Sequence, residues 1–160
     1  MKNLFVGLFL LVSGFVFGQT FERTYGEEGR DEGYAVIEGE DGNFYACGRN
    51  HEGLPFLMKT DSLGVEQWTS TYSLGGSFSV IRQVSSGNLV VGGNISSEPT
   101  LVMYDLDGSE LWSYNPSMGW LGDIEVNNDG NLVVLLNLGG NNVPVENADY
   151  AIFILSLIHI

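Results

Sequence analysis

The stretch Asp41-Gly42-Asn43-Phe44-Tyr45-Ala46-Cys47-Gly48 decides the fold, because it recurs along the chain at a nearly fixed spacing. It returns as Ser86-Gly87-Asn88-Leu89-Val90-Val91-Gly92-Gly93, and again as Asp129-Gly130-Asn131-Leu132-Val133-Val134-Leu135-Leu136. A second pattern, Asp-x-x-Gly-x-Glu-x-Trp, is formed by Asp61, Gly64, Glu66 and Trp68, and it returns 44 residues later as Asp105, Gly108, Glu110 and Trp112. Repeats of about 40–50 residues in strand-rich sequence are typical of β-propeller blades.

The repeat therefore predicts an all-β fold, a partial β-propeller of about three four-stranded antiparallel blades whose ring is not closed. The expected blades span residues 27–72, 73–115 and a partial 116–154. Phe21-Glu22-Arg23-Thr24-Tyr25 matches the outer-strand sequence Trp68-Thr69-Ser70-Thr71-Tyr72, so residues 20–26 are predicted to be an outer strand without its own blade. Because propellers close with about four to eight blades, we expect the chain to be an N-terminal fragment.

Apolar runs and turn residues within each repeat predict four short strands. They are placed at 34–38, 44–48, 55–60 and 65–72, then at 79–84, 89–93, 100–104 and 109–114, and finally at 122–126, 132–136 and 150–154. The second strand of each repeat is apolar almost throughout, which favours burial on both faces. The turns at Gly42, Gly87 and Gly130 are predicted to be type I′ hairpins, since Gly accepts positive φ. Residues Val36, Ile81 and Ile124, six before those glycines, are expected to share one core position.

The two ends of the chain differ from the repeats. Residues 1–18 combine one basic residue with a short apolar run and a small residue at Gly18, which indicates a secretory signal peptide. We therefore expect a protein that is secreted or displayed on the outer-membrane surface, with no membrane insertion after cleavage. Residues 155–160 break the repeat and are similar to the translation of a sequencing-library adapter, so we interpret them as an adapter-derived tail.

The Asp-x-x-Gly-x-Glu-x-Trp pattern resembles the tryptophan-docking repeat of quinoprotein-like and WD40-like β-propellers. Together with the Asp-Gly-Asn turn, it looks still more like the repeats of secreted Bacteroidetes propeller proteins, over roughly residues 21–154. The resemblance implies blades whose Trp packs against the neighbouring blade, and proteins with such repeats often carry a C-terminal sorting domain. The Ala before the Asp and the Thr before the Gly of the quinoprotein repeat are missing, and no quinone-binding residues are visible. The resemblance thus implies the fold and no redox chemistry.

Charge narrows the classes of partner. The formal net charge is −14, and such an acidic surface repels nucleic-acid phosphates and anionic lipid. We therefore expect no nucleic-acid partner. The single cysteine, Cys47, excludes an intrachain disulfide and is interpreted as a small core residue.

No residue pattern predicts a catalytic or metal site. The loops 105–110 and 127–131 place oxygen donors at alternate positions, but neither has the twelve-residue EF-hand spacing, so hairpin turns are favoured over calcium sites. The acidic group Glu27, Glu28, Asp31 and Glu32 is interpreted as a solvated surface rather than as a glycosidase pair. His51 has no second His or Cys nearby in the sequence, and no nucleophile motif occurs.

Aromatic residues in variable segments are the best candidates for ligand contact. Trp120 has no equivalent in the other repeats, and Tyr114 lies in a variable segment; both could stack on a sugar, although packing is the commoner role of such rings.

Three functional hypotheses follow. The leading one is an exported, non-catalytic propeller that binds protein or glycan at the cell surface, without a cofactor. The alternative is a glycoside-active or quinone-dependent propeller enzyme whose active site lies in further blades. A third is a structural role in a larger surface protein.

Overall fold

A computed structural model describes residues 21–116, 118–138 and 150–156, and all its regular structure is β-strand. The first sheet holds β1 (Glu32–Glu38), β2 (Phe44–Arg49), β3 (Pro55–Thr60) and β4 (Glu66–Thr71). The second holds β5 (Gly76–Gln83), β6 (Leu89–Ile95), β7 (Glu98–Tyr104) and β8 (Glu110–Tyr114). The third holds β9 (Trp120–Val126), β10 (Leu132–Asn137) and β11 (Tyr150–Leu155).

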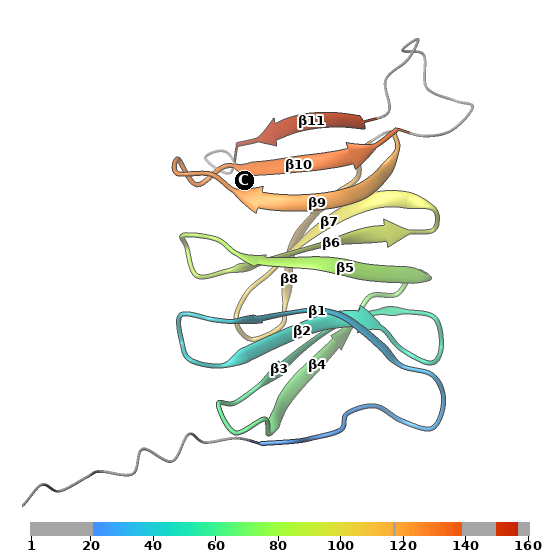
Figure 1. The fold of residues 1–160 in the computed structure, drawn as a ribbon, viewed down its shortest axis with the longest axis vertical. Helices are drawn as coiled ribbons and strands as arrows, with labels where there is room; N and C mark the ends of the chain where they lie inside the picture. Colours follow the sequence, from blue (N-terminus) through green and yellow to red (C-terminus); the bar gives the residue numbers. More distant parts are fainter. Residues whose placement is uncertain (1–20, 117, 139–149, 157–160) are drawn as a thin grey trace, which may run out of the picture.

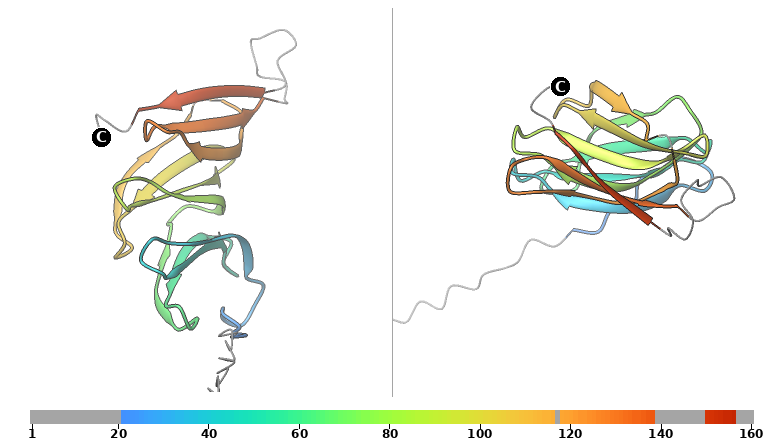
Figure 2. Two further views of the ribbon diagram at one scale, coloured as in Figure 1. Left: turned by 60° about the vertical axis from the view of Figure 1, so that its left-hand side comes forward. Right: turned by 90° about the horizontal axis from the view of Figure 1, so that it is seen from above.

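The three sheets are stacked face to face, with the first at one end and the third at the other (Figure 1). Strands follow one another in chain order within every sheet, and all neighbours are antiparallel. This arrangement confirms the predicted fold class: all-β, with three blade-like antiparallel sheets of three or four strands. Figure 2 shows the stack from two further directions, with β11 at the end opposite the first sheet.

Each predicted strand of the three repeats is present and ends within three residues of its expected limits. β11 includes Leu155, the first residue of the expected tail. The predicted outer strand at 20–26 is wrong over its described part, because residues 21–27 form no strand. A strand needs backbone hydrogen bonds to a neighbouring strand, whereas this segment reaches the turn before β4 through side chains: Arg23 Nε donates to the Leu63 carbonyl and the Tyr25 hydroxyl donates to the Gly64 carbonyl. The predicted signal peptide and residues 157–160 lie outside the described residues.

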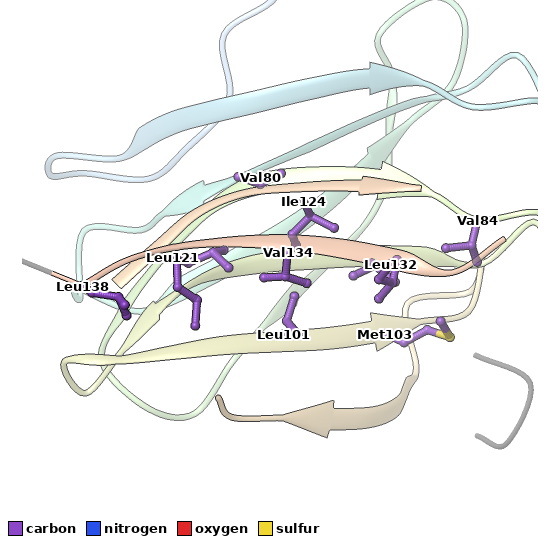
Figure 3. Close-up of a cluster of buried hydrophobic side chains, with 11 residues drawn as sticks. Val80, Val84, Leu101, Met103, Leu121, Ile124, Leu132, Val134 and Leu138 are labelled. Carbon is purple, nitrogen blue, oxygen red and sulfur yellow. The ribbon is translucent and has the colours of Figure 1, made fainter. Parts of the chain in front are cut away.

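Two hydrophobic cores hold the stack together, one between each pair of adjacent sheets. The core between the first and second sheets contains Tyr45, Cys47 and Leu57 from one side and Phe78, Ile81 and Val91 from the other. The core between the second and third sheets includes Leu101, Ile124 and Val134 (Figure 3). A Cβ on Gly92 would lie 2.4 Å from Ile124 Cδ1. The glycine in β6 therefore lets the third sheet approach closely.

Burial on both faces is confirmed for β6 alone. Its residues are buried almost throughout, whereas β2 and β10 alternate between more and less buried positions. The second sheet has a neighbour on each face, and the end sheets have one neighbour each among the described residues. For the same reason Ile81 and Ile124 are fully buried, while Val36 is 66% exposed. The prediction that these three share a core position is wrong for Val36.

The turns at Gly42, Gly87 and Gly130 are not type I′, which corrects the prediction. In the first, the Gly42 N–H donates to the Gly39 carbonyl and the Gly39 N–H donates to the Asn43 carbonyl. Only the glycine has positive φ, so each loop is a three-residue type I turn closed by a glycine bulge. The type I′ requirement of two positive φ angles is met instead at Ser96 and Ser97, between β6 and β7.

The repeated Asp61 and Asp105 close the turns between the third and fourth strands. Asp61 Oδ1 accepts hydrogen bonds from the Leu63 and Val65 amides, at 2.9 and 2.8 Å. Asp105 Oδ1 accepts from the Asp107 and Ser109 amides in the same way, at 3.0 and 2.8 Å. Such Asx turns satisfy backbone donors that the ladder leaves unpaired. The role of this Asp in each repeat is to close the turn with its side-chain oxygen.

Trp68 connects the first sheet to the second. Its indole Nε1 donates to the Leu106 carbonyl at 3.1 Å, and its ring lies over Gly108. This is the packing on a neighbouring blade that the resemblance implied. Phe21 lies over Gly64 in the corresponding way, and the Tyr25 hydroxyl donates to the Gly64 carbonyl at 2.7 Å. The segment 21–25 thus occupies the place of a preceding outer strand without its hydrogen-bonding ladder.

Candidate functional site

A hollow of about 670 Å³ lies between the outer face of the first sheet and the chain segment that leads into β1. Its floor comes from the sheet face turned away from the second sheet, with Ala46 from β2, Phe56 and Met58 from β3, and Thr69 and Thr71 from β4. Alternation along each strand places these side chains on one face. The floor is therefore apolar towards β2 and β3 and hydroxylated towards β4.

The rim of the hollow is acidic. Its charged residues are Glu27 and Asp31 from the segment before β1, Glu52 from the loop after β2, and Glu66 from β4. Among the described residues, neither Lys nor Arg lines the hollow. Glu66 Oε1 accepts a hydrogen bond from the Thr69 hydroxyl at 2.8 Å, which orients that carboxylate along the outer strand. Four carboxylates around an apolar floor attract a cationic group that has an aliphatic stem.

Asp31 ties the segment before β1 to the loop after β2. Its Oδ1 accepts the His51 amide at 2.9 Å, and its Oδ2 accepts the Glu27 amide at 3.2 Å. The His51 imidazole Nδ1 lies 3.7 Å from Asp31 Oδ1, and its Nε2 lies 4.0 Å from Glu27 Oε2. Sequence reasoning missed this group because His51 lies 20 residues from Asp31. The group could have been found from the hairpin that β1 and β2 form, because such a hairpin brings the residues before β1 next to those after β2.

Another acid of the predicted solvated cluster, Glu32, has local partners. Glu32 pairs with Arg30, with Nη2 and Oε1 at 2.6 Å, and it accepts a hydrogen bond from the Tyr34 hydroxyl. The Tyr34 hydrogen bond is the main cause that lowers the pKa of Glu32. Glu32 thus remains an ionised surface group.

The two predicted ligand-contact aromatics lie on different sheets. Tyr114 ends β8, is 43% exposed, and its ring centroid lies 6.3 Å from that of Phe153 in β11. Trp120 begins β9, is 47% exposed, and lies opposite Asn137 of β10. Neither lines the acidic hollow. Tyr114 packs on Phe153, and ligand contact by Tyr114 and by Trp120 stays a prediction.

The loops considered for calcium use their oxygens in the turns themselves. Asn127 Oδ1 accepts hydrogen bonds from the Asp129 and Asn131 amides at 3.0 and 2.9 Å, as Asp105 Oδ1 does in its own loop. Over the part of the chain that the structure describes, no group of three or more His, Cys, Asp and Glu side chains is placed to hold a metal ion. The described residues form no helix that is long and apolar enough to cross a bilayer.

A polar group inside the first sheet involves Asp41, Tyr45 and Lys59. Asp41 Oδ2 lies 3.0 Å from Lys59 Nζ and accepts the Tyr45 hydroxyl at 2.8 Å. Burial opposes ionisation of Asp41, but hydrogen bonds from Asn43, Tyr45 and Lys59 outweigh it and hold its pKa well below the ordinary value. Lys59 also lies 3.5 Å from the Leu106 carbonyl that Trp68 uses. This group reinforces the contact between the first two sheets.

Cys47 is fully buried, which agrees with its interpretation as a core residue. Burial raises the pKa of its thiol to about 12. A thiol that stays protonated at neutral pH is a poor nucleophile.

No protein-family model matches the chain, and no curated protein matches it either. Among solved structures, the chain is similar to a protein of unknown function from Bacteroides caccae, with 19% sequence identity and a TM-score of 0.52. The similarity covers 69% of this chain and 40% of that protein. The chain therefore spans less than half the length of this neighbour, and the likeness supports the fold alone.

Proposed function

We propose that the chain belongs to an exported, non-catalytic β-propeller that binds a protein partner at the cell surface, and that the acidic hollow receives a Lys or Arg side chain of that partner. The signal-like residues 1–18 support export. The observation that carries the binding proposal is the group of four carboxylates around an apolar floor, where the described part of the chain places neither Lys nor Arg.

The shape and chemistry of the hollow match a basic side chain better than a sugar. Phe56, Met58 and Ala46 offer apolar surface to an aliphatic stem, and Glu27 and Glu66 offer acceptors to a charged head. Two aromatic residues, Tyr25 and Phe56, also line the hollow, but the four carboxylates beside them favour a cationic group over a neutral sugar, and the exposed Trp120 lies outside the hollow. A glycan ligand is therefore the second outcome of the test rather than the first expectation.

Binding of the purified chain to a library of Lys- and Arg-containing peptides and to a glycan array tests the proposal. We expect basic peptides to bind, with affinity falling as salt rises. The double variant Glu27→Gln/Glu66→Gln should weaken binding about tenfold, corresponding to roughly 1.4 kcal/mol. A matched control, Glu98→Gln/Asp107→Asn, removes the same charge at exposed positions outside the hollow and should leave affinity within about twofold.

Two results would contradict the proposal. Equal loss of affinity in both double variants would assign the effect to net charge alone. Binding to glycans with no response to basic peptides would replace the protein partner by a sugar.

A further inference from the structure

The four carboxylates on the rim of the hollow lie in two groups. Glu52 belongs to the loop between β2 and β3, and Glu27 and Asp31 lie beside the same loop, because His51 is within 4.0 Å of both. Glu66, in contrast, is the first residue of β4. The hollow therefore has three acids near the β2–β3 loop, which we call the loop acids, and a fourth near the start of β4.

Strand pairing places these two groups at opposite ends of the hollow. Glu66 pairs with Thr60, the last residue of β3, whereas Pro55, the first residue of β3, directly follows the loop that carries Glu52. The five-residue step from Pro55 to Thr60 spans about 17 Å in a strand that rises about 3.3 Å per residue. One basic side chain can therefore reach the acids at one end of the hollow and leaves those at the other end without a partner.

The floor between the two ends is apolar. Phe56 and Met58 occupy alternate positions of β3, so both side chains face the hollow. Met58 pairs with Ala46 on one side and with Thr69 on the other, and both of these residues also line the hollow. The chemistry of the hollow along β3 is thus acidic, apolar and acidic again.

We propose that the segment of the partner that enters the hollow is extended and carries two basic residues, at positions i and i+4, with an apolar residue at i+2. In an extended chain these three side chains lie on one face, and the two basic residues are about 13 Å apart. The long basic side chains span the remaining distance to the loop acids and to Glu66, and the apolar side chain lies over Phe56 and Met58. This inference rests on the proposed function, because it takes the hollow to receive a basic partner.

Two peptides of identical composition, both acetylated and amidated, test the spacing. The spaced peptide is Ser-Arg-Ser-Leu-Ser-Arg-Ser, and the adjacent peptide is Ser-Ser-Leu-Arg-Arg-Ser-Ser. We expect the purified chain to bind the spaced peptide about tenfold more tightly, because only that peptide engages both ends of the hollow at once. Replacing the Leu of the spaced peptide by Ser should weaken binding about fivefold, through the loss of its contact with the apolar floor.

Substitution of Glu66 tests whether the preference comes from the two ends of the hollow. Glu66 stands alone at its end, so Glu66→Gln leaves only the loop acids, and the spaced and adjacent peptides should then bind within about twofold of each other. The matched control, Glu98→Gln, removes the same charge at an exposed position outside the hollow and should keep the preference of about tenfold.

The possible results separate this inference from the proposed function. Equal binding of the two peptides by the unmodified chain would overturn the inference and leave a basic partner in place. A preference for the spaced peptide that survives Glu66→Gln would overturn it as well, because the second basic residue would then bind elsewhere. Failure of both peptides to bind, even at low salt, would contradict the inference and the proposed function together.

Discussion

Phe21 lies so close to Gly64 that a Cβ on the glycine would come within 2.4 Å of the ring atom Cε2. Trp68 lies over Gly108 in the same manner, with the corresponding atom at 2.9 Å. Gly64 and Gly108 thus hold the same position in successive repeats, and each is covered by an aromatic residue. The two aromatic residues, Phe21 and Trp68, begin the two matching outer-strand sequences. The sequence match between segments 21–25 and 68–72 has a counterpart in space, although the first segment forms no strand.

Gly64→Ala should destabilise the chain more than Gly87→Ala. Both glycines have positive φ, at 74° and 87°, so both alanines are strained by about 1–2 kcal/mol. Only the Cβ at position 64 meets a neighbour, while nothing lies within 4 Å at position 87. We expect roughly 1 kcal/mol of additional loss at Gly64, measured by urea unfolding. In a Phe21→Ala background this difference should shrink; if it stays constant, Phe21 does not rest on Gly64 in solution.

Ser96→Asn/Ser97→Gly should stabilise the hairpin between β6 and β7. Both serines have positive φ, at 50° and 70°, and Asn-Gly is the pair that a type I′ turn favours. A gain of about 1 kcal/mol is expected in thermal or urea unfolding.

Ser85→Asn/Ser86→Gly is the matched control for that hairpin. It makes the same replacements in the turn before β6, where neither serine has positive φ. This change should be neutral or destabilising, since Gly adds freedom to the unfolded chain. A similar gain in both pairs would contradict the assignment of the type I′ turn.

Asp41→Asn should lower stability at pH 7 by about 1 kcal/mol, a value discounted for a side chain that is 27% exposed. The folded-state pKa of Asp41 is depressed by its hydrogen bonds and by Lys59. Its contribution is therefore present above about pH 4 and is lost as the pH falls further. Urea unfolding from pH 7 to pH 2 should show the two proteins converging at acid pH. A difference that is independent of pH, or one matched by the exposed Asp107→Asn, would show that ionisation of Asp41 contributes nothing.

The exposed face of β11 should cause self-association. Tyr150, Ile152 and Ile154 are 64%, 62% and 62% exposed, whereas Leu101, the counterpart of Ile152 in β7, is fully buried. Exposed apolar stripes beside an open edge promote aggregation. Sedimentation over a range of concentrations should show oligomers, and Ile152→Ser/Ile154→Ser should reduce them. A monomeric, cooperatively unfolding chain with both isoleucines present would contradict this expectation.

Periodicity predicted the strands and their order because each repeat carries its own turn glycine and apolar runs. Gly42, for example, has equivalents at Gly87 and Gly130, and each of the three lies in the turn between the first and second strands of its sheet. The turn type was wrong because Asp-Gly alone does not fix loop length, which depends on how residues 39 and 43 pair across the hairpin. The exposure of Val36 was missed because a repeat pattern says nothing about which copy stands at the end of the stack.

The acidic hollow could be predicted only in part. The acids at 27 and 31 were recognised as a cluster, but Glu52 and Glu66 join them through strand pairing rather than through proximity in sequence. His51 was set aside as a lone histidine because its neighbours come from the other end of the β1–β2 hairpin. A site assembled across a sheet face can be predicted only when the strand register is known, and the register cannot be read from composition.

Among the described residues, only the second sheet has another sheet on each of its faces, and this sets how stability is shared along the stack. In a linear array of similar units, each added unit contributes its own folding free energy and one more favourable interface. The average stability of a unit therefore rises with the number of units, while the outermost ones open first. Amide exchange in this protein should be slowest in β6 and fastest at the two ends, so a nick or a destabilising substitution in the second sheet would uncouple the other two, and the same change in an end sheet would remove only that sheet.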